Sequence, residues 1–343
     1  MELQKIYREV DSILDKVEFE QIASGFRRYR FAVYNNETIC LDGELIPYSQ
    51  QFFGNTSLLY QGEYIAIWNV GFDPVEDSEQ FAASMVHEMF HCHQNTLGEK
   101  RYPSDLKLLN YPDDVDNFTK KYNENCYLAD AYEHGDEGAF ARFAGIRAAR
   151  MEKHPDMVRE ELKAETLDGA AEYAGLKALR MIAPEKFERK IQDCLRCLRA
   201  ESEQQFDIRR ISYYAGAVFF LCLERLGKTV RNEIYSELTV YEQNPIATAR
   251  EVVIRPCPFV ETAHATLVEN RARTIDEHVA GSSYTECDGE ICGYDPMNMF
   301  RVGKRIYCKH IVFLKVDEAV QTHQRAIVLE LKDGSEREIR GYY

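Results

Sequence analysis

Residues 77–98, DSEQFAASMVHEMFHCHQNTLG, constrain the fold more than any other stretch of the chain. Asp77 with Gln80 three residues later forms an approximate capping pair, and Gly98 is a stop signal, so we expect one helix between them. Apolar side chains cover a wide arc of this helix, and they are Phe81, Ala82, Met85, Val86, Met89 and Phe90. A helix that is apolar over such an arc is predicted to be largely buried, with the rest of the chain packed around it.

Three ionisable side chains interrupt the apolar arc. His87 and His91 are one turn apart, project from the same side and can hold one metal ion between them. Glu88 lies about 100° round from His87, which is too close to chelate comfortably but well placed to reach a metal-bound water. Zinc lowers the pKa of its water to roughly 7 and the carboxylate can take the proton, so this spacing predicts hydrolysis.

A structural pair of core histidines is the alternative interpretation of the same helix. Burying His87, Glu88 and His91 without partners would be costly, and this cost favours the metal site. His93 is offset from the face that carries His87 and His91. We expect His93 either to be solvated or to contact a metal ligand without binding the metal itself.

A zinc site of this type needs a third protein ligand, which leaves one position for water. Residues 164–179, AETLDGAAEYAGLKAL, predict a second helix whose small residues allow a close approach to the first. Glu165, Asp168 and Glu172 fall at i, i+3 and i+7, so all three carboxylates are predicted to share one face. A solvated acidic face is the alternative. The expected cofactor is Zn²⁺.

The charge balance limits the partners. The chain has 343 residues, with 42 Lys and Arg against 57 Asp and Glu, for a formal net charge of -15. Nucleic acid and anionic membrane surfaces would be repelled on average, so neither is an expected partner. The N-terminus lacks the pattern of a secretory signal, no apolar run is long enough for a membrane span, and the ten cysteines are scattered. The predicted location is the cytoplasm.

Three regions follow from the pattern along the chain. Residues 1–250 are expected to form the catalytic domain, which is β-rich to about residue 75 and helical afterwards, with breaks at glycines and prolines. Residues 251–280 are predicted to be a linker, and residues 281–343 a small β unit with a hairpin at KDGS. Four ligand-type residues in this unit have a loosely zinc-like spacing, and they are Cys287, Cys292, Cys308 and His310. Buried thiols in strands are favoured over a second zinc site there.

The motifs HEMFH and DGAAEY resemble those of the gluzincin metallopeptidases, the clan that includes thermolysin and the aminopeptidases. Their pattern is HExxH on one helix and a ligand glutamate on a later helix, often within E-G-x-A-x-Y. Asp168 stands where the group has this glutamate, and Glu172 matches the acid that orients a ligand histidine. The resemblance covers roughly residues 60–225 and implies a zincin-like α+β fold, mainly helical, with an N-terminal β portion.

The resemblance also implies roles for particular residues. It favours Asp168 as the third ligand, although Glu165 competes because its side chain is longer and lies one turn earlier. The segment YIAIWNV would be an edge strand beside the cleft, where an extended peptide can pair. Tyr213, in a Y-x-x-G helix, is a candidate to stabilise the oxyanion or else a structural tyrosine. Arg210 would assist it or pair with an acid.

We therefore expect a zinc-dependent metallopeptidase that acts on a peptide or protein substrate, with Glu88 as general base. Hydrolysis of a non-peptide amide by the same residues is one alternative. A zincin-fold binding or regulatory protein without turnover is another, although the intact Glu88 argues against it. The pattern leaves open the substrate, the choice between endopeptidase and exopeptidase, and the oligomeric state.

Overall fold

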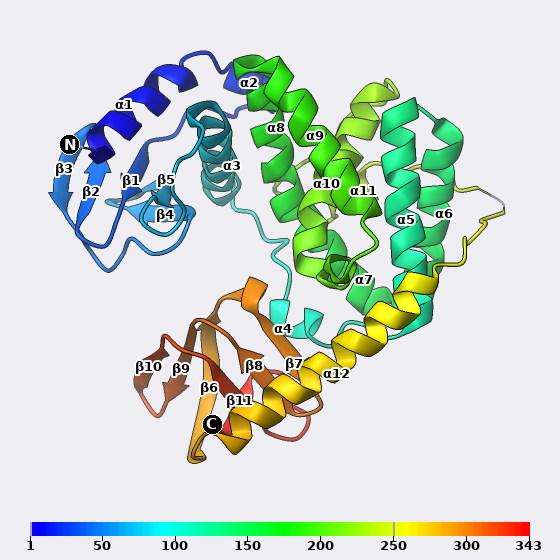
Figure 1. The fold of residues 1–343 in the computed structure, drawn as a ribbon. Coiled ribbons are helices and arrows are strands. Elements are labelled where there is room, and N and C mark those ends of the chain that lie inside the picture. Colours follow the sequence, from blue (N-terminus) through cyan, green and yellow to red (C-terminus); the bar gives the residue numbers. More distant parts are fainter. Residues whose placement is uncertain (1, 250) are drawn as a thin grey trace.

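The computed structural model describes residues 2–249 and 251–343, and it has a sheet near each end of the chain with helices between them (Figure 1). In Figure 1 the N-terminal sheet lies to the left of the helices and the C-terminal sheet lies below, and the Phe53 and Phe313 rings of the two parts have centroids 6.4 Å apart. This arrangement confirms the α+β class that the sequence predicts.

The N-terminal sheet has five strands in the order β3-β2-β1-β5-β4. They are β1 (Phe31–Tyr34), β2 (Thr38–Leu41), β3 (Glu44–Pro47), β4 (Thr56–Tyr60) and β5 (Glu63–Asn69). Strand β5 pairs in parallel with β1 and antiparallel with β4, so it lies inside the sheet. The prediction that YIAIWNV forms an edge strand is therefore wrong, because pairing with the distant β1 covers that edge. The edge strand on this side is β4.

The middle of the chain is helical. Its longer helices are α3 (Ser78–Thr96), α5 (Val115–His134), α6 (Glu137–Lys153), α7 (Pro155–Ala164), α8 (Ala170–Ile182), α9 (Pro184–Arg199) and α10 (Ile208–Arg225). The predicted breaks are confirmed where prolines and glycines mark them. Pro155 and Pro184 open α7 and α9, and Gly135 closes α5 in a left-handed conformation that glycine adopts without strain.

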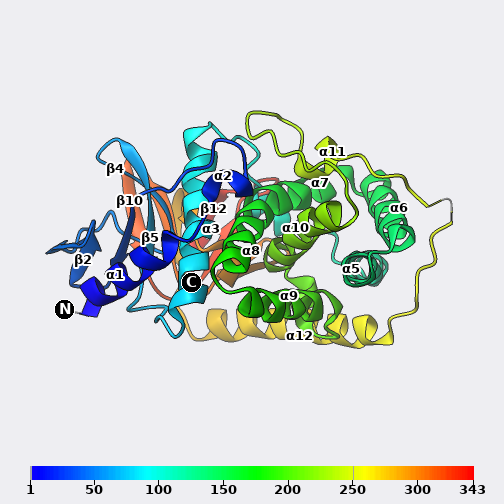
Figure 2. The ribbon, with the colours of Figure 1, turned by 90° about the horizontal axis from the view of Figure 1, so that it is seen from above.

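Helix α3 is the predicted central helix. The Asp77 carboxylate accepts hydrogen bonds from the backbone N–H groups of Glu79 and Gln80, and the chain leaves the helix before Gly98, which has a φ of 75°. In the view of Figure 2, α3 stands between the N-terminal sheet and α8. The helices α1 (Glu2–Leu14) and α2 (Phe19–Ile22) complete the N-terminal part.

A single π-helical turn, Glu165–Gly169, joins α7 to α8. Its hydrogen bonds reach one residue further than those of an α-helix, so side chains on either side are rotated relative to the regular spacing. This turn lies within the stretch that the sequence predicts as one regular helix, and it changes which carboxylates share a face.

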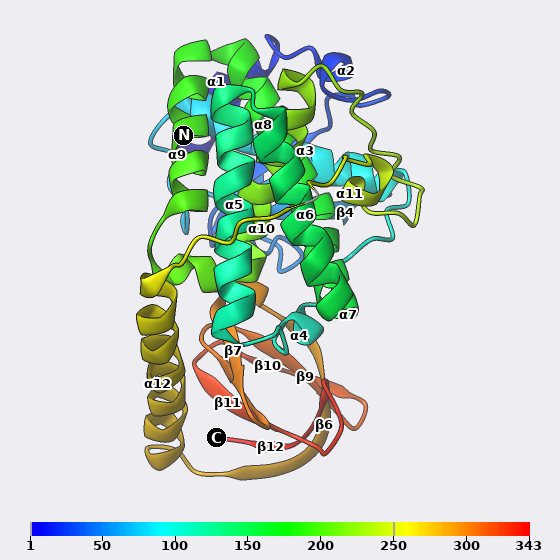
Figure 3. The ribbon, with the colours of Figure 1, turned by 90° about the vertical axis from the view of Figure 1, so that its right-hand side faces the viewer.

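The C-terminal part begins with α12 (Pro258–Ala280), a 23-residue helix within the predicted linker. Figure 3 shows α12 running along one side of a seven-stranded antiparallel sheet in the order β10-β9-β6-β12-β11-β8-β7. The strands are β6 (Thr285–Tyr294), β7 (Met299–Val302), β8 (Arg305–Cys308), β9 (Val312–Val316), β10 (Ala319–His323), β11 (Ile327–Leu331) and β12 (Glu338–Tyr342). Strands β11 and β12 pair across the KDGS turn, as predicted.

The helical part and the C-terminal sheet share a hydrophobic core. The short helix α4 (Asp105–Leu108) carries Leu106, which is 3% exposed and packs with Ile291, Leu314 and Leu329 of the sheet. The sheet is therefore attached to the helical part by buried contacts in addition to the chain itself. Among the described residues, no helix combines the length and the apolar character needed to cross a membrane.

Candidate metal centre

A close contact between α3 and α8 brings the two predicted motifs together. A Cβ atom at Gly175 would lie 2.9 Å from the carbonyl oxygen of Ala83 and 3.5 Å from Cβ of His87. Only glycine allows this approach without movement of the α3 backbone. The small residues of α8 therefore allow the close approach to α3 that the sequence predicts.

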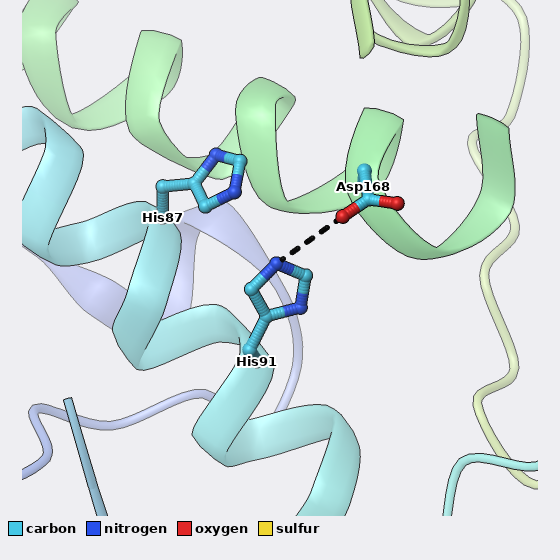
Figure 4. Close-up of side chains that lie close together, drawn as sticks. All are labelled: His87, His91 and Asp168. Atoms are coloured by element: carbon cyan, nitrogen blue, oxygen red, sulfur yellow. Dashed lines mark ion pairs between the residues drawn. The ribbon is translucent and has the colours of Figure 1, made fainter. Parts of the chain in front are cut away.

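His87, His91 and Asp168 form a cluster in which one possible ligand atom of each residue lies within 4.8 Å of the others. Both imidazole rings project from α3 toward the helix that carries Asp168 (Figure 4). The distance from His91 Nε2 to Asp168 Oδ1 is 3.6 Å, and the ring centroids of the two histidines are 5.0 Å apart. The structure thus brings together the three residues that the sequence singles out as metal ligands.

Both histidines are held through their Nδ1 atoms. His87 Nδ1 lies 3.2 Å from Glu172 Oε2, and His91 Nδ1 lies 2.7 Å from Gln94 Oε1. Carboxylate and amide oxygens are acceptors, so each Nδ1 carries a proton, and on a neutral ring Nε2 then keeps its lone pair. Burial and the neighbouring His87 lower the pKa of His91 to about 4, which keeps its ring neutral and in the tautomer that binds a metal. Burial lowers the pKa of His87, but its hydrogen bond to Glu172 and the neighbouring carboxylate charges together raise that pKa above its usual value, so a metal at His87 Nε2 would displace a proton from that ring.

Gln94 is a residue that the sequence interpretation missed. Its Nε2 donates to the carbonyl oxygen of Leu167 at 2.9 Å, and this bond fixes the amide so that Oε1 faces His91. The signal for it is local, because Gln94 follows His91 by three residues on the same helix. Glu172 holds His87 from α8 in the way the sequence predicts.

Arg209 of α10 is the second missed residue. Its Nη1 donates to Asp168 Oδ2, while its Nε donates to Asp105 Oδ1 at 2.8 Å. Asp168 therefore offers its other oxygen, Oδ1, to the two histidines. Arg209 precedes Tyr213 by four residues, which would have placed it on the same face. Arg210 instead pairs with Asp207, one of the two roles expected for it.

Glu165 does not join this cluster. Its two carboxylate oxygens accept from Arg147 Nη1 and Nη2 at 2.7 Å and 2.6 Å. The prediction that Glu165, Asp168 and Glu172 share a face is therefore wrong. The π turn rotates Asp168 relative to Glu165, and the two carboxylates point to different partners.

Glu165 belongs to a second group of buried carboxylates with Glu124 and Glu161. Three buried cations lie among them, and they are Lys121, Arg147 and Arg150. Every carboxylate has a cationic partner, and three positive charges balance three negative charges. We interpret this group as an ion network that joins α5, α6 and α7, because a further cation would have to displace one already there.

A cavity of about 230 Å³ opens beside the three-residue cluster and is lined by His87, Glu88 and Tyr213. Glu88 is 7% exposed, and burial raises the pKa of its carboxyl group to about 7. The Tyr213 ring stacks on His87 with centroids 5.9 Å apart and an interplanar angle of 9°. Burial and the charge of Asp168 raise the pKa of Tyr213 above its usual value, so its hydroxyl remains a donor.

Two other sequence expectations concern residues away from this cavity. His93 is 3% exposed and packs against Phe26 and Phe90, so the prediction of a solvated or supporting residue is wrong. It lies on the apolar side of α3. The three cysteines of the C-terminal unit lie in strands, Cys287 and Cys292 in β6 and Cys308 in β8. Cys308 is buried, Cys287 is half-buried and Cys292 is exposed, so the expectation of buried thiols is confirmed for Cys308 and wrong for Cys292.

The donor set fits zinc, which binds imidazole nitrogen and carboxylate oxygen in four-coordinate sites. Two Nε2 atoms and one Oδ1 atom would supply three ligands and leave one position for water or substrate. Comparison with protein-family models, curated proteins and solved structures found no match to this chain. The geometry and chemistry of these residues are therefore the basis for inferring the function of the chain.

Proposed function

We propose that the chain is a zinc-dependent metallopeptidase with a zincin-like fold of the gluzincin type. His87, His91 and Asp168 would hold the ion. The main support is the hydrogen bonding of the two imidazoles: Glu172 and Gln94 occupy both Nδ1 atoms and leave both Nε2 atoms free beside Asp168. A buried structural histidine would need a partner for Nε2 as well as for Nδ1, so two Nε2 atoms beside one carboxylate and without hydrogen bonds among the described residues favour a metal ligand role.

The remaining residues of the cavity have complementary roles in this proposal. Zinc in such a site acidifies a bound water and polarises a carbonyl group. Glu88 would accept the proton of the attacking water and later give it to the leaving amine. The Tyr213 hydroxyl donates to the developing oxyanion.

The N-terminal sheet supports a peptide substrate. Strand β4 is an edge strand, and Ser57 of β4 accepts a hydrogen bond from Asn95 of α3 at 2.6 Å. One side of β4 has no partner strand within the described residues, and Leu59 on it is 57% exposed. An extended peptide can pair with such an edge through its backbone.

Metal analysis together with a mixed peptide library tests the proposal. We expect about one zinc per chain and cleavage of library peptides. Glu88→Gln should keep the zinc and lower the cleavage rate by orders of magnitude, because it removes the base but no ligand. His87→Ala should lose both zinc and cleavage. His134→Ala is the matched control, because His134 is exposed and away from the cluster.

Three outcomes would contradict this proposal. Loss of zinc in Glu88→Gln, or cleavage as fast as that of the parent, would remove Glu88 from the role of base. Zinc binding without cleavage of any peptide would favour one of the alternatives, a binding protein or a hydrolase of another amide.

A further inference from the structure

A second, larger cavity of about 710 Å³ lies where α10, α12 and the C-terminal sheet meet. Its volume is within the usual range for sites that bind small organic molecules. Most of its wall is apolar or aromatic, as such sites require, and the apolar part includes Phe206, Leu267, Met299, Phe300 and Tyr307. No role proposed above for the metal centre uses this space.

Arg271 of α12 is the polar group that distinguishes this cavity. Its guanidinium carbon lies 5.6 Å from the centroid of the Phe300 ring, and Phe300 in turn stacks on Tyr307 with centroids 5.1 Å apart. Within the described residues, no carboxylate lies within ion-pair distance of Arg271. A guanidinium that stacks on an aromatic face keeps its N–H groups free at the edge.

The other arginines of the wall are already engaged. Arg209 pairs with Asp105 and Asp168, Arg210 pairs with Asp207, and Arg301 donates to the carbonyl oxygen of Gly303 at 2.7 Å. Burial lowers the pKa of Arg271 below its usual value, which shows that water solvates this guanidinium poorly. An anion that accepts two hydrogen bonds from Arg271 would replace the lost hydration.

The shape of the acceptor selects among anions. The wall holds four carboxylates against four arginines and Lys309, so its formal charge favours neither a monoanion nor a dianion. Asp113, Asp207 and Glu203 lie near enough to act on Arg271 through their negative charge. A carboxylate can place both of its oxygens on the fork of the guanidinium, which leaves no further anionic oxygen to face these acids, and its apolar body then reaches the aromatic wall.

We propose that this cavity binds a monocarboxylate with an apolar body, with its carboxylate on Arg271 and its apolar part against Phe300 and Tyr307. The carboxylate belongs to a free acid or to the C-terminal residue of a peptide, which share this chemistry. The inference does not depend on the proposed peptidase function. Arg209 lines the cavity and also contacts Asp168, so one side chain separates the two sites.

Calorimetric titration of the full chain in the presence of a chelator tests the inference without any catalytic metal. The probes are N-acetyl-L-phenylalanine, 3-phenylpropanoate, and N-acetyl-L-phenylalaninamide, which has no carboxylate. We expect at least one of the two acids to bind and the amide to bind at least tenfold more weakly. Binding of both acids points to a free acid, and binding of the acetylated amino acid alone points to a peptide terminus.

Arg271→Met should weaken binding of the acid at least tenfold while it preserves the apolar contact with Phe300. Arg273→Met is the matched control on the same helix, because Arg273 is exposed, and it should bind like the parent. Circular dichroism melting verifies that both variants are folded. Failure of both acids to bind the parent, or equal binding by a folded Arg271→Met, overturns the inference. Neither outcome affects the zinc experiment.

Discussion

Asp168 and Glu165 are three residues apart, yet their side chains have different partners. Asp168 faces His91, whereas Glu165 forms a paired hydrogen bond with Arg147. We predict that Asp168→Asn abolishes tight zinc binding, although it keeps an oxygen for Arg209. Glu165→Gln should keep the zinc and unfold at a lower temperature, because the buried Arg147 loses one carboxylate partner and keeps Glu124. A zinc titration and a thermal melt of both variants test this prediction.

Near-parental zinc affinity in Asp168→Asn would remove Asp168 from the ligand set. Glu172→Ala is the comparison for a supporting residue. It removes the acceptor of His87, for which a loss of roughly 10- to 100-fold in affinity is typical. The order of the three affinities therefore separates a ligand from a supporting acid.

The part of the site that the sequence predicts depends on spacing along single helices. His87, Glu88 and His91 are fixed relative to one another by one α-helix, so their shared face follows from the sequence alone. The bond from Gln94 to His91 depends on the carbonyl group of Leu167 in another helix. Arg209 reaches Asp168 from a third helix, α10. No spacing within α10 or within the segment that carries Asp168 predicts that the two side chains are in contact.

At the scale of elements, the π turn and α10 pack through two glycines. A Cβ atom at Gly216 would lie 2.5 Å from the carbonyl oxygen of Glu165 and 2.7 Å from Cα of Gly169. We predict that Gly216→Ala pushes α10 away from the π turn, destabilises the fold by about 1–3 kcal/mol and weakens zinc binding. Gly281→Ala, at the end of α12, is the control for the substitution itself. Equal melting temperatures for Gly216→Ala and the parent would contradict this contact.

The ion network between α5, α6 and α7 makes stability depend on pH. Despite the opposing effect of burial, Arg147, Arg150 and Lys121 lower the pKa of Glu124 to about 2, compared with 4.5 for an ordinary glutamate. The stabilisation is therefore fully present above pH 4.5 and is lost as the pH falls toward 2. We predict a falling melting temperature across this window.

Glu124→Gln tests the origin of that pH dependence. The variant should be less stable by about 3–5 kcal/mol near neutral pH, because Arg147 and Arg150 lose a buried partner. Its melting temperature should change less between pH 4.5 and pH 2 than that of the parent. An identical slope in the two proteins would place the acid sensitivity elsewhere.

Elements differ in how well their sequence predicts them. Helix α3 has its cap at Asp77 and its stop at Gly98, and both signals are local. The position of β5 inside its sheet depends on pairing with β1, which lies some thirty residues earlier in the chain. The amino-acid pattern of β5 does not reveal this pairing, so the prediction that β5 is an edge strand is wrong. The π turn has no sequence signal that separates it from a regular helix, and it packs against α10, a segment some forty residues later in the chain, through Gly169 and Gly216.

At the scale of the whole molecule, Leu106 couples the helical part to the C-terminal sheet. We predict that Leu106→Ala destabilises the protein by about 2–5 kcal/mol and increases hydrogen exchange in the sheet. Zinc affinity should also fall, since the neighbouring Asp105 holds Arg209 against Asp168. Leu97→Ala is the control, because Leu97 is 45% exposed. Unchanged exchange in the sheet would show that the two parts are independent.

The order of synthesis gives Leu106 a further meaning. A chain that grows from its N-terminus presents His87, His91 and Asp168 long before the strands that cover Leu106. Until those strands emerge, Asp105 belongs to a helix with no sheet beneath it, and Arg209 is not braced against Asp168. We therefore expect a nascent chain to hold zinc weakly until the strands that cover Leu106 have emerged and folded.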